Sequence, residues 1–249
     1  MQIQRGRSSE VPLHPNVLDA VMKVNITQLI ISATAMMLFT VVSLFLPAGN
    51  LSWPAGWAFF LLMFGFSIVI TFWLLRFNPD LLAERLTGIG RADQKMWDKI
   101  FLALTAVAFS GWLALMGLDA VRFRWSQLPP WLQAIGALLL LGSFYIFYLT
   151  FRENAYLSPA VRVQTERGQT IVSTGPYRYV RHPLYAGLIP FVLGTALLLG
   201  SWYGMLGGLL LIVMVAWRAV HEERVLCEEL DGYRAYMKRV RYRFVPYIW

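Results

Sequence analysis

The sequence predicts an all-α integral membrane protein, a polytopic bundle of about six transmembrane helices with a cytoplasmic C-terminal amphipathic helix. Three observations predict this class. The mean hydropathy is +0.53. Of the 249 residues, 57% are hydrophobic and only 14% are charged, whereas soluble domains carry about 25% charged residues. The ten Trp, eleven Tyr and sixteen Phe suit aromatic belts at two membrane interfaces. A soluble globular protein is therefore excluded.

A helix needs about 20 apolar residues to cross the hydrocarbon core of a bilayer. Six segments are candidates: Ile26–Leu46, Trp53–Leu75, Ile100–Leu118, Trp131–Phe151, Leu184–Leu199 and Tyr203–Val220. The first four are long enough to span. The last two are short and are joined by residues 200–204, which predicts a tight helical hairpin, with a re-entrant pair as the alternative.

The distribution of basic residues predicts the orientation. With both termini inside, 20 of the 22 Lys and Arg residues lie on the inner side, and only Arg122 and Arg124 lie outside. Cytoplasmic loops of membrane proteins carry such an excess of Lys and Arg. We therefore expect both termini and the loop before Leu184 on the cytoplasmic side. No Asp, Glu, Lys or His lies within the six segments, which argues against a proton relay.

Several functional classes find no support in the sequence. The net charge of +8 is interpreted as orientation bias and attraction to anionic lipids, so no nucleic-acid partner is expected. The single cysteine, Cys227, excludes an internal disulfide. Three scattered histidines predict no metal site, and no Walker loop, GxGxxG or HExxH motif is present. Any chemistry must therefore use a reactive group that a cofactor brings in.

The chain is expected to form one integral membrane domain, residues 1–249. It comprises a polar cytoplasmic segment (1–25), a four-helix membrane part (26–151) and a part that carries the candidate site (152–249). Near the C-terminus, Leu226, Leu230, Tyr233 and Met237 form one apolar helical face. This spacing predicts an amphipathic helix over 217–240 on the inner leaflet, which Gly232 is expected to kink or divide.

Residues 175–187, GPYRYVRHPLYAG, form the first candidate site segment. Closely spaced prolines and glycines predict a shaped loop rather than a helix interior. His182 precedes the start of an apolar helix, whose first backbone N–H groups favour an anion. Gly187 would let a ligand or a neighbouring helix approach the backbone closely.

A second group of charges lies at the end of the last apolar segment. Arg218 and Glu222 are four residues apart and share a helix face, and Glu223 follows. One interpretation is a solvated ladder of ion pairs. The other is a functional site, because partial burial at a membrane helix end perturbs such groups. With Arg178, Arg181, His182 and Tyr185 they would gather at one membrane face.

Residues 150–249 resemble the isoprenylcysteine carboxyl methyltransferase family, which belongs to a wider group that also includes phospholipid N-methyltransferases. The motifs are GPYRYVRHPLYAG, R-x-x-x-E-E from Arg218, L-x-x-x-x-x-G-Y-x-x-Y from Leu226 to Tyr236, and the closing RVRYRFVPYIW. The resemblance implies a membrane methyltransferase that uses S-adenosylmethionine at the cytosolic face. It further implies a lipophilic small-molecule or lipidated acceptor that enters from the bilayer.

The resemblance also assigns roles to residues. Arg218 and Glu222 are the expected catalytic residues, and no metal is expected. The residues expected to bind the cofactor are Tyr177, Arg181, His182, Pro183, Tyr185, Gly187, Glu222, Glu223, Tyr236 and Arg241. Of these, Tyr236 and Arg241 would help the C-terminus close over the cofactor.

The possible methyltransferase functions differ in the chemistry of the methyl acceptor. A carboxylate, as in isoprenylcysteine O-methylation, is already a nucleophile at neutral pH and needs only a cation such as Arg to hold it. An amine, as in a phospholipid or other N-methyltransferase, would require Glu222 or Glu223 to accept a proton. An NADPH-dependent sterol-type reductase and a non-enzymatic membrane scaffold or small transporter are further alternatives.

Overall fold

The computed structural model describes residues 24–87, 90 and 94–249, and within these ranges it contains helices and no strand. The α-helices are α2 (Ile26–Ala48), α3 (Pro54–Phe77), α4 (Pro79–Thr87), α5 (Met96–Gly117), α6 (Pro130–Glu153), α7 (Pro183–Leu199), α8 (Trp202–Glu229) and α9 (Tyr233–Arg239). Five spans are long and apolar enough to cross a membrane, and α7 is a shorter apolar helix. The predicted class, a polytopic helical membrane protein, is confirmed. The predicted cytoplasmic segment 1–25 lies almost entirely outside the described residues.

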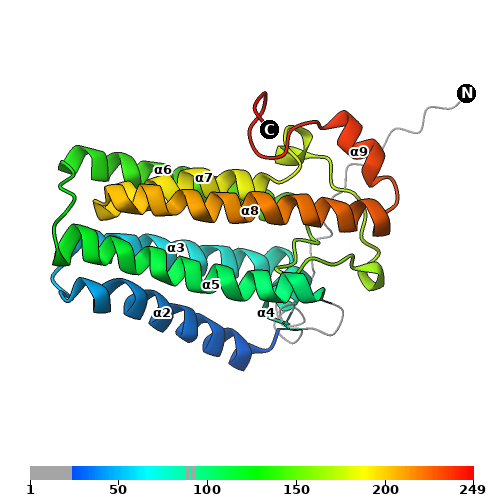
Figure 1. Cartoon of the computed structure of the whole chain (residues 1–249). Coiled ribbons are helices and arrows are strands. Elements are labelled where there is room, and N and C mark those ends of the chain that lie inside the picture. Colours follow the sequence, from blue (N-terminus) through cyan, green and yellow to red (C-terminus); the bar gives the residue numbers. More distant parts are fainter. Residues whose placement is uncertain (1–23, 88–89, 91–93) are drawn as a thin grey trace, which may run out of the picture.

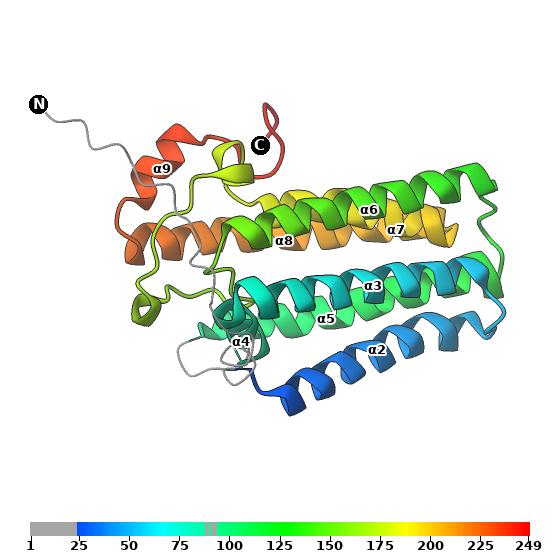
Figure 2. The ribbon, with the colours of Figure 1, turned by 180° about the vertical axis from the view of Figure 1, so that it is seen from behind.

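The long helices run roughly side by side in two layers (Figure 1). One layer holds α6, α7 and α8, and the other holds α3 and α5 with α2 outside them. The reverse view in Figure 2 shows the same division. The core between the layers is apolar and includes the fully buried Leu44, Phe59, Leu113 and Leu140. Side chains on the outer faces are apolar as well, because they would meet lipid.

Helix α7 is the most enclosed helix of the bundle, and glycines allow its close packing on α6. A Cβ added at Gly136 would lie 2.3 Å from the Leu198 backbone nitrogen, and one at Gly194 would lie 2.7 Å from the Gly136 carbonyl oxygen. The helix ends at Gly200, whose φ of 80° suits glycine. Ser201 then caps α8. The predicted helical hairpin of 184–220 is therefore present.

A buried carboxylate organises the end of the bundle that contains this hairpin turn. After α5 the chain forms a short π-helical turn, Leu118–Arg122. Asp119 in this turn is fully buried and accepts hydrogen bonds from the Ser126 and Ser201 hydroxyls. The Ser126 oxygen in turn accepts the backbone N–H of Trp202. These contacts fix the start of α8 against α5.

The opposite end differs from the sequence prediction in two ways. The nine-residue α4 follows α3 directly and was not predicted, because it is too short and polar to stand out. The predicted amphipathic helix over 217–240 is not one separate helix. Its first half continues α8 without a break to Glu229, and Gly232, with φ of 81°, separates the short α9 as expected. Arg218, Glu222 and Glu223 therefore extend from a membrane helix.

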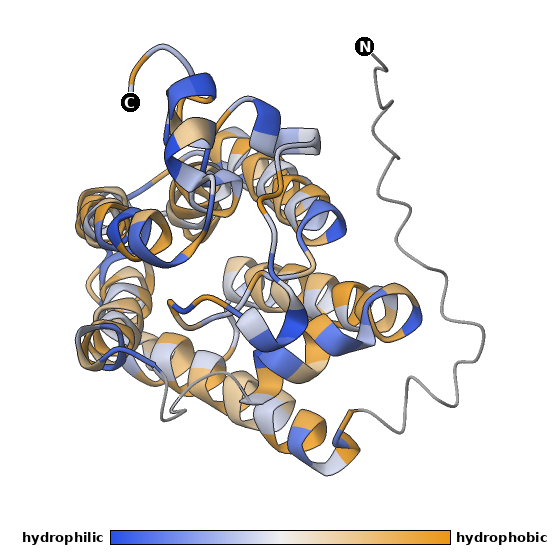
Figure 3. Ribbon diagram, turned by 90° about the vertical axis from the view of Figure 1, so that its right-hand side faces the viewer, coloured by the Kyte–Doolittle hydropathy of each residue, from blue (hydrophilic) through white to orange (hydrophobic). Residues whose placement is uncertain are grey.

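We call this end of the bundle, where α4 and α9 lie, the site end. Figure 3 views it directly and shows hydrophilic segments on α9, α4 and the end of α8, ahead of largely hydrophobic helices. The connection between α6 and α7 also crosses this end. It holds two short 3₁₀ turns, Thr165–Arg167 and Gly175–Arg178. The polar and aromatic residues of the candidate site therefore gather outside the apolar bundle.

Candidate functional site

A cavity of about 270 Å³ lies at the site end, close to the lower limit of the about 300–1,000 Å³ usual for small-molecule sites. Its walls come from α4, α5, the α6–α7 connection, the start of α7, α8 and α9. Eight of the eleven predicted site residues line it: Tyr177, Arg181, His182, Pro183, Tyr185, Arg218, Glu222 and Tyr236. The other three, Gly187, Glu223 and Arg241, do not line it.

The loop that forms one wall owes its shape to glycine and proline. Gly175 has φ of 53°, and a Cβ there would lie 2.4 Å from Cγ of Glu153. Pro176 and Pro183 each stand at the start of a helical segment, where a missing N–H costs nothing. The loop consequently places Tyr177 and His182 against the cavity.

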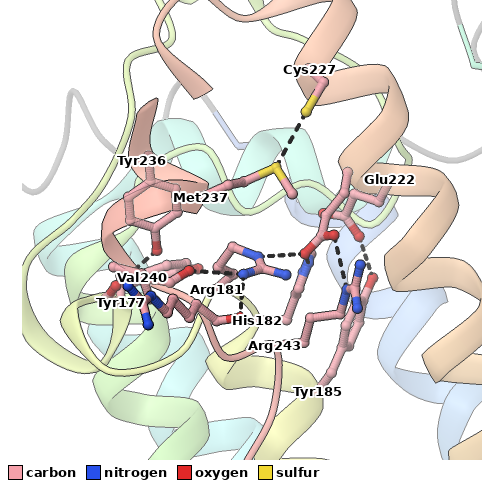
Figure 4. A network of polar contacts seen from close by, with 12 residues as sticks. Tyr177, Arg181, His182, Tyr185, Glu222, Cys227, Tyr236, Met237, Val240 and Arg243 are labelled. Atoms are coloured by element: carbon pink, nitrogen blue, oxygen red, sulfur yellow. Dashed lines mark hydrogen bonds and ion pairs between the residues drawn. The ribbon is translucent and has the colours of Figure 1, made fainter. Parts of the chain in front are cut away.

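Glu223 is buried beneath this wall among two arginines and a histidine. Its Oε1 accepts a 2.6 Å hydrogen bond from Arg181 Nε and lies 3.1 Å from His182 Nε2. Its Oε2 accepts a 2.9 Å bond from Arg243 Nε. Figure 4 shows Arg181, His182 and Arg243 converging at this point. Both oxygens of Glu223 thus accept hydrogen bonds from protein groups and tie the loop to α8, and its predicted contact with the cofactor stays a prediction.

Backbone contacts extend this cluster into a latch between the loop and the C-terminus. Arg181 Nη1 donates to the carbonyls of Val240 and Arg241 at 2.8 and 2.7 Å. The N–H groups of Arg181 and His182 donate to the carbonyls of Tyr242 and Arg243. Arg241 therefore contributes its backbone while its side chain is exposed. We call the group formed by residues 181–182, Glu223 and 240–243 the C-terminal latch.

Gly187 serves helix packing. A Cβ there would lie 2.7 Å from the Phe147 ring, and its carbonyl accepts a 2.8 Å hydrogen bond from the Ser143 hydroxyl. The sequence left open whether a ligand or a neighbouring helix approaches the backbone at Gly187. In the structure, helix α6 approaches it.

A second polar network crosses the cavity wall at α8. Arg218 Nη1 donates to the Tyr185 hydroxyl at 3.2 Å, and this hydroxyl donates to Glu222 Oε2 at 2.7 Å. Figure 4 shows the Tyr185–Glu222 contact. Within the part of the chain that the structure describes, no hydrogen bond to Glu222 Oε1 is found. Glu222 therefore presents a free oxygen to the cavity.

Asp98 holds Arg218 in place and was missed by the sequence prediction. It is fully buried, and its Oδ1 accepts from Arg218 Nε at 3.0 Å. Its Oδ2 accepts from Gln94 Nε2 and from the Val161 backbone. In the sequence it stands between Lys95 and Lys99 in the first turn of a helix, where an acidic residue has an ordinary electrostatic role. Only the fold brings it to Arg218, 120 residues away.

The α6–α7 connection is tied down over the cavity. Arg162 forms two hydrogen bonds with Glu84 of α4, at 3.2 and 2.8 Å, and both side chains are buried. Ser158 donates to the same carboxylate. The connection thus encloses the cavity from the side of α4, and burial of its charges requires this pairing.

Tyrosines close the cavity on the side of α9. The Tyr236 hydroxyl donates to the Tyr177 carbonyl at 2.8 Å, and the Tyr177 hydroxyl accepts from Asn154. Burial raises the pKa of Tyr236 to about 12 and raises the pKa of Tyr177 further. Both remain neutral hydroxyls near pH 7, so this wall carries aromatic faces without negative charge.

The fold and the cavity define a helical integral membrane protein with a cavity of mixed polar and apolar lining at one end of its bundle. Comparison with known proteins relates its C-terminal part to methyltransferases. Residues 131–230 match the family model of phospholipid methyltransferases. The chain is also 30% identical over 109 residues to a protein-S-isoprenylcysteine O-methyltransferase of Schizosaccharomyces pombe.

These matches confirm the resemblance inferred from the motifs. The similarity to the S. pombe protein covers 41% of this chain and 44% of that protein, so the chain spans less than half the length of this relative. The family match includes α6, α7 and α8 and ends before α9. Asp98 and all of α4 lie outside it.

Proposed function

We propose that the protein is an S-adenosylmethionine-dependent membrane methyltransferase whose acceptor is lipophilic and carries a carboxylate. The observation that carries this proposal is the network of Arg218, Tyr185 and Glu222. It forms a wall of the cavity, within the segment similar to methyltransferases.

The cavity residues fit the chemistry of the proposed cofactor. Glu222 offers a carboxylate oxygen without a protein donor in the described structure, which suits an ammonium group or a ribose hydroxyl. Tyr177, His182 and Tyr185 offer aromatic faces, which attract a sulfonium cation. When bound, S-adenosylmethionine supplies a methyl carbon to which the acceptor oxygen bonds as the carbon–sulfur bond breaks, its electron pair remaining on sulfur.

Arg218 would hold the acceptor. Its position is defined by Asp98, by the Pro159 carbonyl at 2.6 Å and by the Phe101 ring, 5.5 Å from its guanidinium carbon. A carboxylate is ionised at neutral pH, so no base needs to remove a proton. The rate would then come from alignment of the acceptor with the methyl group and from exclusion of water once both ligands fill the cavity.

An amine acceptor is the second candidate, and the same site contains the group it would need. Glu222 faces the cavity with a free oxygen and could accept the proton that an amine loses. The guanidinium of Arg218, however, has a binding partner in a carboxylate and none in an amine. We therefore favour the acid.

We further propose that the site end faces the cytoplasm and that the acceptor enters laterally from the bilayer. Apart from Arg122 and Arg124, the described Lys and Arg residues belong to segments at the site end, which supports this orientation under the positive-inside rule.

Purified protein in nanodiscs, labelled S-adenosylmethionine and paired lipophilic acceptors test the proposal. The pair is an S-prenylated N-acetylcysteine and a lipophilic primary amine of similar length. We expect a base-labile labelled methyl ester from the acid. Label only in the amine would establish N-methylation, and label in neither acceptor, with no binding of S-adenosylhomocysteine, would refute a methyltransferase.

A further inference from the structure

We propose that Arg85 of α4 binds the acceptor carboxylate together with Arg218 and thereby selects acids over amines. The inference deepens the proposed function and rests on it. Arg85 lies outside residues 131–230, the part of the chain that matches the methyltransferase family model. Its helix, α4, lies at the end of the layer that holds α3 and α5 (Figures 1 and 2).

Arg85 lines the same cavity as Arg218. Its Nη1 donates a 3.1 Å hydrogen bond to the Leu157 carbonyl, and its guanidinium carbon lies 4.8 Å from the centroid of the Phe151 ring. These contacts hold the group against the wall that α4 and the α6–α7 connection form. The loop 175–185 and α9 lie on the other side, in the layer of α6, α7 and α8 (Figure 1).

The donors left on Arg218 are too few to bind a carboxylate alone. A guanidinium carries five N–H groups. Nε of Arg218 donates to Asp98, Nη2 lies within reach of both Asp98 and Pro159, and Nη1 donates to Tyr185. One N–H of Nη1 therefore remains, and a two-point grip on a carboxylate needs a second donor.

Arg85 supplies that donor. It gives one hydrogen bond, to Leu157, among the residues that the structure describes, so further N–H groups can face a ligand. Every other arginine that lines the cavity has an acidic partner: Glu84 for Arg162, Glu223 for Arg181 and Asp98 for Arg218. Within the described residues no carboxylate pairs with Arg85.

The charge of Arg85 persists in this environment. Burial, and next the positive charge of Arg218, lower its pKa to about 10. The side chain is therefore protonated at neutral pH, beside a second cation. A carboxylate placed between Arg85 and Arg218 would relieve their repulsion, whereas an ammonium group would add to it.

The cofactor also carries a carboxylate. The test therefore distinguishes binding of the cofactor carboxylate by Arg85 from binding of the acceptor carboxylate. Arg85→Gln is compared with Arg224→Gln, a matched change of an exposed arginine on α8 that does not line the cavity. For each protein in nanodiscs, calorimetry gives the affinity for S-adenosylhomocysteine. Labelled methyl transfer gives KM for an S-prenylated N-acetylcysteine, and competition gives the affinity for its uncharged amide.

Loss of a charged hydrogen bond predicts that Arg85→Gln raises KM for the acid about 10- to 100-fold. The affinities for S-adenosylhomocysteine and for the amide should stay unchanged, which also shows that the variant is folded. Arg85→Lys, which keeps the charge but loses the planar fork, should raise KM less. Arg224→Gln should match the wild type.

Four results would overturn the inference. If Arg85→Gln lowers the affinity for S-adenosylhomocysteine while KM for the acid is unchanged, Arg85 binds the cofactor. If it raises KM for the acid and lowers the affinity for the amide by the same factor, Arg85 shapes the cavity without recognising charge. If it behaves as Arg224→Gln does while the wild type transfers methyl groups, the inference fails and the proposed function stands. A wild type that binds no S-adenosylhomocysteine would refute both.

Discussion

Substitution of Glu223 by glutamine should destabilise the protein by releasing the C-terminal latch. The change preserves shape but removes the charge between Arg181 and Arg243. Breaking a buried ion pair costs about 3–5 kcal/mol. Arg181 keeps two carbonyl acceptors and the Arg243 side chain is 24% exposed, so we expect the lower limit, about 3 kcal/mol. A chain of this size then loses about 6–12 °C in Tm.

Glu229→Gln is the matched control, because it removes a carboxylate from the same helix. Glu229 pairs with Lys95 at 2.7 Å, but both side chains are about 40% exposed, and such a pair contributes about 0–1 kcal/mol. Tm is measured by thermal unfolding in detergent, and limited proteolysis should cut residues 240–249 of Glu223→Gln first. Equal Tm values for the two variants, with cofactor affinity lost only in Glu223→Gln, would refute the structural role.

Two further predictions concern packing and the orientation of Arg218. Gly136→Ala should destabilise the bundle by about 1–3 kcal/mol, because the added methyl group clashes with α7. Gly142→Ala on the same helix is the control: its methyl group meets no atom within 4 Å and should stabilise the bundle by about 0.5–1 kcal/mol. Equal changes in Tm for the two variants would contradict the tight α6–α7 contact. Asp98→Asn and Arg218→Lys should each lower kcat, and the double variant should lose less than the sum, with a coupling of about 0.5–3 kcal/mol. Additive losses would mean that Asp98 does not act through Arg218.

Much of the fold was predictable because its causes are local. Apolar segments long enough to cross a bilayer predicted the spanning helices, and the turn at Gly200 and the break at Gly232 followed from glycine conformation. The extension of α8 to Glu229 was not predicted. The sequence becomes charged after Val220, and this change in polarity predicts a separate surface helix. In the structure, α8 continues through the change as one helix to Glu229.

The candidate site was predictable where a single segment carries it and unpredictable where distant segments meet. The loop 175–187 and the R-x-x-x-E-E pattern led to seven residues of the cavity wall, whereas the lining residues of α4, α5 and the first half of the α6–α7 connection were not predicted. Nothing local distinguishes Glu223, which is buried in the latch, from Glu222, which faces the cavity. Asp98 comes from α5 and Arg85 from α4, and only tertiary packing places Asp98 against Arg218 and brings Arg85 to the cavity that Arg218 lines.

A calorimetric titration of the purified protein with S-adenosylhomocysteine and, separately, with NADPH tests whether the cavity binds a methyl donor. The account predicts one S-adenosylhomocysteine site per chain and none for NADPH. It also predicts that Glu222→Gln weakens the affinity about tenfold or more, by loss of a charged hydrogen bond, while Glu228→Gln, an exposed neighbour on α8, leaves it unchanged. Binding of NADPH without S-adenosylhomocysteine, or equal affinities for the two variants, would contradict the account.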